Sequence, residues 1–545
     1  MTRQPTFIDL FSGCGGFTLG MLRAGFRCKA AIDFNHEAIS TLKANLVENL
    51  PKKLGLSPVE QALQRDLTEF SPRELEALIG TREIDVIVGG PPCQGFSTAN
   101  GANHGVERFK DDPRRHLYRQ FLDYVECFQP KVFVIENVLG LRSAAGGKYF
   151  TAVQHEARIL GRGKGLPGYR VHEQIEKAES LGVPQKRRRQ LIIGVRADLP
   201  GFFRKDLPIP ARANLGTMLG DAIGDLPALA AGEGVHEVAY DMRRRTKNFL
   251  GGTRDEIRKN FLNNVAQVDF AKCITNHMAR PHSERDIRDF QRLKEGENSS
   301  VAMRNGVQFE FPYDKETFTD RYTRQHRNRP CSTIVAHLGK DGLMFIHPTQ
   351  DRSLTPREAA RVQTFPDWFI FPKMRTHAFR MIGNAVPPLI SESIGITVME
   401  FLKKIDDIKP KYCFAKAGVF IPKNEREAIE RLSDAAKLPI KELQARVGDD
   451  FVKNWHALLW LFPGLHPDNA LDHGKETGVW DEANKIFPEL PREERRYYLR
   501  SGWPVPLKTI GDEAWRRYNN EEIADEAFYC VEAQKAGMGL HIGTK

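Results

Sequence analysis

Gly89-Gly90-Pro91-Pro92-Cys93-Gln94-Gly95-Phe96-Ser97 is a tight turn that follows a short β-branched run, residues 84–88. The run predicts a buried strand. Two glycines and two prolines end that strand and force the chain to turn, which presents Cys93 directly after it. A cysteine in this place is either a small apolar filler or an exposed nucleophile. The turn alone leaves both interpretations open.

Other predicted strands also end in turns that carry chemistry. Residues 6–10 predict a strand, 11–16 a glycine-rich turn, and 17–24 a helix, a pattern typical of nucleotide-binding α/β sheets. Asp33 follows a strand at 29–32, and Glu136 follows one at 132–135. Each has a second interpretation, since Asp33 or Asn35 could cap a helix and Glu136 could be a surface acid. Because ligands bind at the carboxyl ends of such strands, we expect the glycine turn, Asp33, Cys93 and Glu136 to meet.

Three further segments bear on this site. Residues 98–116 form a long polar loop without periodicity, which is typical of a lid over an active site. An amphipathic helix is predicted at 117–128. A basic run, 185–189, precedes a strand at 190–195; such a run is usually a solvated face, but its place beside a central strand favours a role.

The second half of the chain divides into three parts. Residues 200–326 are irregular and rich in basic clusters, which indicates a smaller domain or a long insertion. From Cys331 onward the pattern predicts strands at 332–336 and 342–346, and a helix that Thr355 caps. A turn at 379–388 then leads into a helix ending near Lys404. The last part, 410–545, holds five of the six tryptophans and predicts a mostly helical folded unit.

Composition sets broad limits on the protein. The 545 residues carry a net charge of +10, which suits a polyanionic partner, although a mildly basic solvated surface explains it equally well. The eight cysteines are scattered without a C-x-x-C pair, so we expect a reducing compartment and no metal cluster. The N-terminus lacks an apolar signal-peptide region, and no stretch matches a membrane span of about 20 residues. These features predict a cytoplasmic protein that does not enter a membrane.

Taken together in order, the motifs resemble those of the cytosine-5 DNA methyltransferases. The resemblance covers about residues 5–402, interrupted by a variable middle region. Its segments are the following: Asp9 to Gly16 (DLFSGCGG), Asp33-Phe34-Asn35, Gly90 to Gln94 (GPPCQ), Glu136-Asn137-Val138, Gln185-x-Arg187-x-Arg189, and Gly383 to Pro387 (GNAVP). The resemblance implies a Rossmann-like, S-adenosylmethionine-dependent α/β methyltransferase sheet with a smaller target-recognition domain. It places the catalytic domain at 1–199 and 331–405 and the target-recognition domain at 200–330. The segment 410–545 lies outside the resemblance, and we expect it to be a mostly helical C-terminal extension whose role the sequence leaves open.

The resemblance also implies a catalytic set. Cys93 corresponds to a thiolate that adds to carbon 6 of cytosine and makes carbon 5 nucleophilic. Glu136 corresponds to the acid that contacts ring nitrogen 3, and Arg187 and Arg189 to a pair that orients the base and the catalytic groups. Substrate contacts are implied for Gln94, Ser97, Asn137 and Gln185.

The methyl donor implied by the resemblance is S-adenosylmethionine. Phe11, Gly13 and Gly15 match the family's donor-binding glycine turn, and Asp33 matches the acid that holds the ribose. The remaining implied donor contacts are Phe34, Asp66, Pro91 and Asn384. Asp66 and Asn384 are the less secure matches, because an acid placed like Asp66 is more often a cap or turn residue.

The implied substrate is duplex DNA, from which the target cytosine must be flipped, and the implied state is a monomer on DNA. The sequence leaves open whether a cognate restriction endonuclease is a partner or the enzyme is solitary. A transfer-RNA cytosine-5 methyltransferase would share Cys93, Glu136 and the arginines, but the long basic middle region favours duplex DNA. A catalytically silent DNA-binding homologue is disfavoured by the intact Cys93 and Glu136 motifs, and a small-molecule methyltransferase by the inserted region.

Overall fold

The protein was analysed as a computed structural model, which describes residues 3–406 except for 93–116, 144–147, 162–163, 165, 167, 197–198, 200–206, 242, 244–252, 272, 312–321 and 341. Cys93, the predicted lid at 98–116 and the predicted extension at 410–545 therefore lie outside the described residues.

A seven-stranded sheet forms the centre of the described chain, in the order β3-β2-β1-β4-β5-β7-β6. Its strands are β1 (Thr6–Leu10), β2 (Arg27–Asp33), β3 (Ala62–Gln64), β4 (Val86–Gly89), β5 (Val132–Asn137), β6 (Tyr169–Lys177) and β7 (Arg188–Arg196). The first five are parallel, and β7 runs antiparallel to both β5 and β6. Strands β1, β4 and β5 are continuous apolar runs, as expected for a sheet covered on both faces. The predicted α/β fold class is confirmed for this part of the chain.

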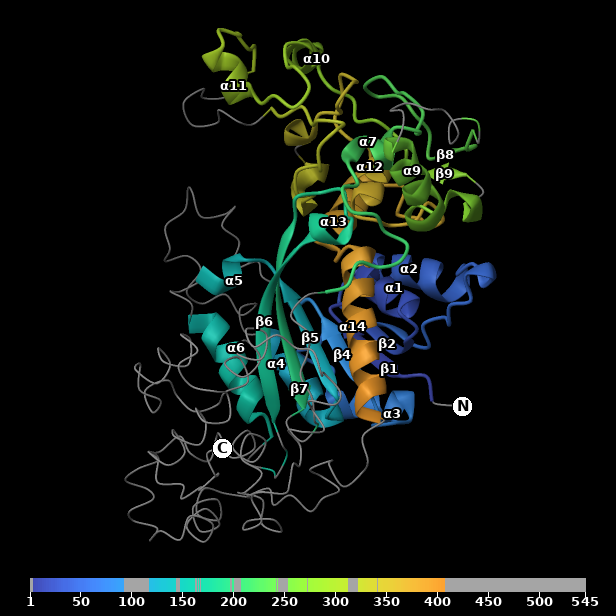
Figure 1. Cartoon of the computed structure of the whole chain (residues 1–545), viewed down its shortest axis with the longest axis vertical. Coiled ribbons are helices and arrows are strands. Elements are labelled where there is room, and N and C mark those ends of the chain that lie inside the picture. Colours follow the sequence, from blue (N-terminus) through green and yellow to red (C-terminus); the bar gives the residue numbers. More distant parts are fainter. Residues whose placement is uncertain are drawn as a thin grey trace, which may run out of the picture.

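Helices cover both faces of the sheet. On one side lie α3 (Pro72–Ile79), α4 (Leu117–Phe128) and α6 (Lys148–Ile159), and on the other α1 (Gly16–Arg23), α2 (His36–Lys43) and α14 (Pro388–Asp406). Helix α14 packs along α1, so the last described helix lies against the first (Figure 1). Small residues permit this approach, since a Cβ on Gly20 would lie 2.1 Å from Ser391 Oγ. The packing joins the beginning and the end of the described chain.

A second group of short elements lies beyond the carboxyl ends of the parallel strands (Figure 1). It contains α7 (Leu219–Ile223), β8 (Glu237–Val238), α9 (Thr253–Asn260), β9 (Ile274–Thr275), α10 (Glu284–Gln291), α11 (Ser299–Arg304) and α12 (Pro356–Val362). Residues around α7, α9 and β9 share the hydrophobic cluster of the sheet, whereas Phe290 to Ile346 contain a separate small cluster built around Tyr322. The proposed boundaries at 200 and 330 stay predictions.

Two expectations about the later chain were wrong. Residues 332–336 and 342–346 are not strands: the first makes one bridge through Cys331 and runs into a 3₁₀-helix at Ala336–Gly339, and the second contains a 3₁₀-helix at Leu343–Phe345. Residues 379–384 are not a turn but the end of α13 (Arg375–Asn384). The predicted cap was confirmed, because Thr355 Oγ1 accepts from the Glu358 amide at the start of α12.

One stretch of the described residues, 375–403, is long and apolar enough to meet a composition test for a membrane span, contrary to expectation. It consists of α13 and α14, and 78 % of its most apolar window is buried inside the domain. Since α14 packs against α1, this is the pattern of a core helix.

Candidate active site

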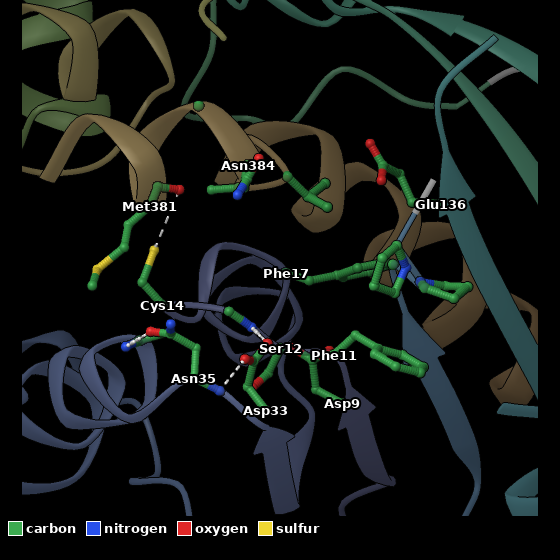
Figure 2. Close-up of a pocket in the computed structure, with 18 of the residues that line it drawn as sticks. Asp9, Phe11, Ser12, Cys14, Phe17, Asp33, Asn35, Glu136, Met381 and Asn384 are labelled. Atoms are coloured by element: carbon green, nitrogen blue, oxygen red, sulfur yellow. Dashed lines mark hydrogen bonds between the residues drawn. The ribbon is translucent and has the colours of Figure 1, made fainter. Parts of the chain in front are cut away.

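A cavity of about 360 Å³ opens at the carboxyl ends of the strands, a volume within the usual range for small-molecule sites. The turns after β1, β2, β4 and β5, the start of β7 and the end of α13 all contribute to it. Figure 2 shows Glu136 and Asn384 across the cavity from Asp33 and Asn35. The lining includes Asp9, Phe11, Ser12, Gly13, Cys14, Asp33, Phe34, Asn35, Pro91, Pro92, Glu136, Asn137, Arg187, Arg189 and Asn384.

The glycine turn and Asp33 are held together by backbone hydrogen bonds. The Gly13 amide donates to Asp33 Oδ2 at 2.9 Å, and the Asn35 amide donates to Oδ1 at 2.8 Å. Gly13 has a φ of +55°, and nothing lies within 4 Å of where its Cβ would be, so ligand atoms can approach the backbone there. Burial raises the pKa of Asp33. Asn35, and not Asp33, caps α2, because its side chain accepts from the Ala38 amide.

The ring of Phe34 lies beside this carboxylate and is 64 % exposed, an unusual position for a large aromatic side chain. It lines the cavity together with Phe11. Gly15 does not line the cavity: it begins α1 with a φ of +94°, and a Cβ there would lie 2.8 Å from Leu46. Its contribution is to let the turn enter the helix.

Asp9 is a site residue to which the sequence analysis assigned no role. It is the last residue but one of β1 and is 1 % exposed, and its Oδ2 accepts from Thr18 Oγ1 at 2.5 Å. Burial, with a smaller contribution from the nearby Asp33 carboxylate, raises the pKa of Asp9 to about 7. Its other oxygen, like the Ser12 hydroxyl, is buried without a hydrogen-bond partner in the described part of the chain. Both residues line the cavity.

We expect Asp9→Asn to change how stability depends on pH. Because the folded-state pKa is raised from 3.8 to about 7, wild-type stability falls as pH rises through that interval. Asparagine can still accept from Thr18 but cannot ionise. The variant should therefore gain stability relative to wild type between pH 4 and pH 8, by up to about 4 kcal/mol. Urea unfolding without ligand at several pH values measures this, and a difference that is the same at every pH would contradict it.

The turn after β4 is fixed by close backbone packing. A Cβ on Gly89 would lie 2.3 Å from the Leu10 carbonyl oxygen, and one on Gly90 would lie 3.5 Å from Glu136 Oε2. The Pro91 carbonyl accepts a 3.1 Å hydrogen bond from Asn137 Nδ2, while Asn137 Oδ1 accepts from the Val138 amide. Strand β5 therefore positions the turn that leads to residue 93.

Glu136 and Arg189 form an ion pair at the cavity. Arg189 Nε lies 2.7 Å from Glu136 Oε1, and the side chains are 13 % and 10 % exposed. The two charges approach closely but are not aligned as a hydrogen bond, because Oε1 has no hydrogen-bond partner in the described residues. The carboxylate can accept a hydrogen bond and the guanidinium can donate one. Together they can bind a heterocyclic ring that carries both a donor and an acceptor.

Arg187 has a different environment. It is 1 % exposed, and its guanidinium donates to the carbonyl oxygens of Ile334 at 3.0 Å and Ala385 at 3.1 Å, with longer contacts to Gly383. These bonds hold the end of α13, and with it Asn384, against the start of β7. Arg187 therefore assembles the cavity from segments almost 200 residues apart.

The thiol of Cys14 lines the cavity. It is buried, and its Sγ lies 3.9 Å from the Met381 carbonyl oxygen. Burial raises the pKa of this thiol to about 12, so it stays protonated at neutral pH. Cys14 is thus a packing residue and not a nucleophile.

A family model described as C-5 cytosine-specific DNA methylase matches residues 5–400. The chain belongs to this family. The enzyme class expected from the sequence, DNA (cytosine-5-)-methyltransferase, is thereby confirmed.

Individual methylases show the same likeness. The type II methyltransferase M.DdeI of Desulfomicrobium norvegicum is 32 % identical over 413 residues, covering 73 % of this chain and 89 % of that protein. M1.HphI of Haemophilus parahaemolyticus is 32 % identical over 403 residues, covering 72 % and 87 %. A crystal structure from E. coli, described as a prophage-encoded DNA modification methyltransferase, superposes with a TM-score of 0.53 at 27 % identity, covering 73 % of this chain and all of that one.

Some residues expected from the methylase motifs are not brought to the cavity. Asp66 accepts from the Thr68 amide and hydroxyl in a local turn. Gln185 is fully buried, where it donates to Val362 and Gln363 and accepts from the Ile334 amide. Cys93, Gln94 and Ser97 lie outside the described residues, although Pro92, which precedes Cys93, lines the cavity.

Proposed function

We propose that this methylase transfers a methyl group from S-adenosylmethionine to carbon 5 of a cytosine flipped out of duplex DNA. The proposal depends on one observation: residues suited to a nucleoside and residues suited to a pyrimidine base line the same cavity. The glycine turn, Asp33 and Phe34 suit a nucleoside, and the turn before Cys93, Glu136 and Arg189 suit a pyrimidine. One cavity can therefore hold a donor and a target base side by side.

The residues present fit the donor. Each Asp33 oxygen accepts one backbone bond and keeps a lone pair for a ribose hydroxyl, and the exposed Phe34 ring can stack on a base. The Ser12 hydroxyl and Asp9 Oδ1 offer polar contacts. Asn384 completes the side facing α13. When bound, S-adenosylmethionine supplies a methyl group on a sulfonium that carbon 5 can attack.

The chain's own residues prepare the base. The Cys93 thiolate adds to carbon 6 and makes carbon 5 electron-rich. Glu136 holds a proton at ring nitrogen 3 and so stabilises the charge that thiol addition creates. Arg189 orients Glu136 and can donate to the base oxygen. Arg187 is a positioning residue: its hydrogen bond to the Ala385 carbonyl holds the neighbouring Asn384 beside the cavity. After transfer, a water molecule takes the proton from carbon 5, the carbon 5–carbon 6 double bond re-forms, and the Cys93–carbon 6 bond breaks to return the Cys93 thiolate.

The names of the relatives suggest a biological setting for this chain, which we add to the proposal. Both M.DdeI and M1.HphI are type II methyltransferases, so we propose that this chain is the cytoplasmic modification enzyme of a restriction–modification system. It would act as a monomer on DNA, beside a cognate endonuclease. The middle region, 200–330, is proposed to read the target sequence.

Transfer of labelled methyl groups tests the activity. Purified full chain is incubated with labelled S-adenosylmethionine and either unmethylated duplex DNA or transfer RNA. We expect label in DNA, at carbon 5 of cytosine, and none in transfer RNA. Label in transfer RNA alone would replace the proposed substrate, and no label in either would overturn the proposal.

We expect Glu136→Gln to lower kcat by roughly 10²–10³-fold. Glutamine keeps the shape but loses the negative charge that pairs with Arg189 and the proton held at ring nitrogen 3. Single-turnover methyl transfer at saturating DNA measures the effect. Glu83→Gln is the matched control, because that side chain is 82 % exposed and its one ion pair within the described residues is with Arg3. A Glu136→Gln enzyme as active as the control would remove Glu136 from catalysis.

A further inference from the structure

A second hollow, of about 410 Å³, adjoins the catalytic cavity. Val138 and Arg189 line both, so the two spaces meet at these residues, beside the Glu136 that pairs with Arg189. One side of this hollow is the start of β7 with Lys186 and Arg188, and the other is the segment carrying Thr333 and Val335. Backbone bonds join the sides, because the Lys186 amide donates to Cys331 and Thr333 Oγ1 donates to the Lys186 carbonyl. We call this hollow the basic groove.

The four basic residues 186–189 alternate between two environments. Arg187 is buried and bonded to carbonyl groups, and Arg189 is paired with Glu136. Lys186 and Arg188 are exposed, and their side chains have no hydrogen-bond or ion-pair partner among the residues described. Two of the four charges therefore serve the folded protein, and two remain available to a partner.

Strand pairing adds a third cation for which no ion pair occurs in the described part of the chain. Arg188 is directly opposite Lys177 in the antiparallel β6–β7 ladder, and Lys177 is also exposed. Like charges directly opposite each other destabilise a sheet. A bound anion would remove that repulsion. The arrangement thus lowers stability of the free protein at the place where an anionic partner would gain most.

The groove also contains one acid, Glu179, whose Oε2 is buried without a hydrogen-bond partner in the described chain. Its charge opposes anion binding in part. Three basic side chains, Lys186, Arg188 and Arg189, outnumber it in the groove. Because the Glu179 charge should weaken the binding of an anion, removing it should strengthen that binding, the opposite of the effect of removing Lys186 or Arg188.

We propose that Lys186 and Arg188 bind the DNA phosphates next to the flipped cytosine, with Lys177 adding to the field. This inference rests on the proposed function, since a flipped base stays attached to its sugar–phosphate backbone. That backbone must leave the catalytic cavity close to the bound base. The basic groove opens at this place, and its unpaired cations suit phosphate oxygens.

The test is the salt dependence of binding to a 30-base-pair unmethylated duplex, measured with the full chain by fluorescence anisotropy. Each lost phosphate contact should lower the slope of log Kd against log salt by about one. We expect this for Lys186→Gln and for Arg188→Gln, and a fall of about two for the double variant. Glu179→Gln should tighten binding. Arg188→Lys should restore most of the slope, because it keeps the charge.

Lys52→Gln is the matched control: Lys52 is exposed in the 3₁₀-helix Lys52–Leu54 that precedes the edge strand β3. It should leave Kd and slope unchanged. Slopes equal to wild type in Lys186→Gln and Arg188→Gln, or an equal fall in Lys52→Gln, would overturn the inference. Wild-type methyl transfer is assayed on the same preparations. If the wild type transfers methyl groups but the salt slopes of the variants are unchanged, only the proposed phosphate contacts are rejected. If the wild type transfers no methyl groups, the proposed function itself is rejected.

Discussion

Replacing Cys93 by serine is expected to abolish methyl transfer while the protein still folds and binds its donor. A serine hydroxyl is a far weaker nucleophile than a thiolate, so addition to carbon 6 should be lost and transfer should fall at least about 10³-fold. The turn before residue 93 supports this role. Gly89 and Gly90 pack against Leu10 and Glu136, and Asn137 holds the Pro91 carbonyl.

Two measurements separate lost chemistry from lost structure. Labelled methyl transfer to duplex DNA reports turnover, and donor binding by calorimetry reports an intact cavity. A duplex with 5-fluorocytosine should remain covalently attached to wild type, because fluorine cannot leave carbon 5 as the proton does. Cys93→Ser should form no such adduct. Cys127→Ser, on α4, is the matched control and should behave as wild type. Full activity in Cys93→Ser would end the proposed mechanism.

The second large effect concerns stability. Arg361 of α12 is fully buried; it donates to Asp225 Oδ1 at 2.6 Å and to both oxygens of Asp367 at 2.6 and 2.9 Å. Asp225 follows α7, so one guanidinium joins the second group of elements to the segment after α12. Arg361→Met would leave the buried Asp225 carboxylate without its counter-charge, and would leave Asp367 with only the longer ion pair to Arg357, at 3.7 Å. We expect a loss of about 3–5 kcal/mol in the free energy of unfolding.

Denaturant unfolding of the full chain measures this loss. Adding Asp225→Asn and Asp367→Asn to Arg361→Met should restore part of it, because the uncompensated charges are then removed. Arg288→Met is the comparison: this arginine pairs with Glu310 on the surface, where an ion pair contributes little. An Arg361→Met protein as stable as Arg288→Met would show that the buried network does not hold these segments together.

The sequence was informative wherever local pattern and strand order were sufficient. The glycine turn after β1 and the acids at the ends of β2 and β5 were expected to meet, and Phe11, Gly13, Asp33 and Glu136 do line one cavity. That inference needed only the rule that parallel strands end at one edge of a sheet. Asp9 was missed because a buried carboxyl near the end of a strand has no local signal that separates it from a neutral core residue.

The errors arose where long-range packing decides the outcome. Residues 332–336 are rich in β-branched side chains like a strand, but the sheet already ends at β6, and the only bridge beside them in the described chain is made by Cys331. Gly383 resembled a turn residue, yet it lies in α13, where a Cβ would come within 2.3 Å of the backbone at Val335 and Ala336. Gln185 fits a substrate motif, but α12 covers it. Such contacts join residues up to 180 positions apart and cannot be read locally.

The pairing of α1 with α14 has a consequence for synthesis in the cell. Ribosomes release the chain N-terminus first, so α1 and its apolar surface emerge more than 360 residues before their partner helix. Until then a nascent chain lacks both α14 and the end of α13, so its cavity has no Asn384. A polypeptide whose translation stops early would therefore be inactive and a substrate for chaperones.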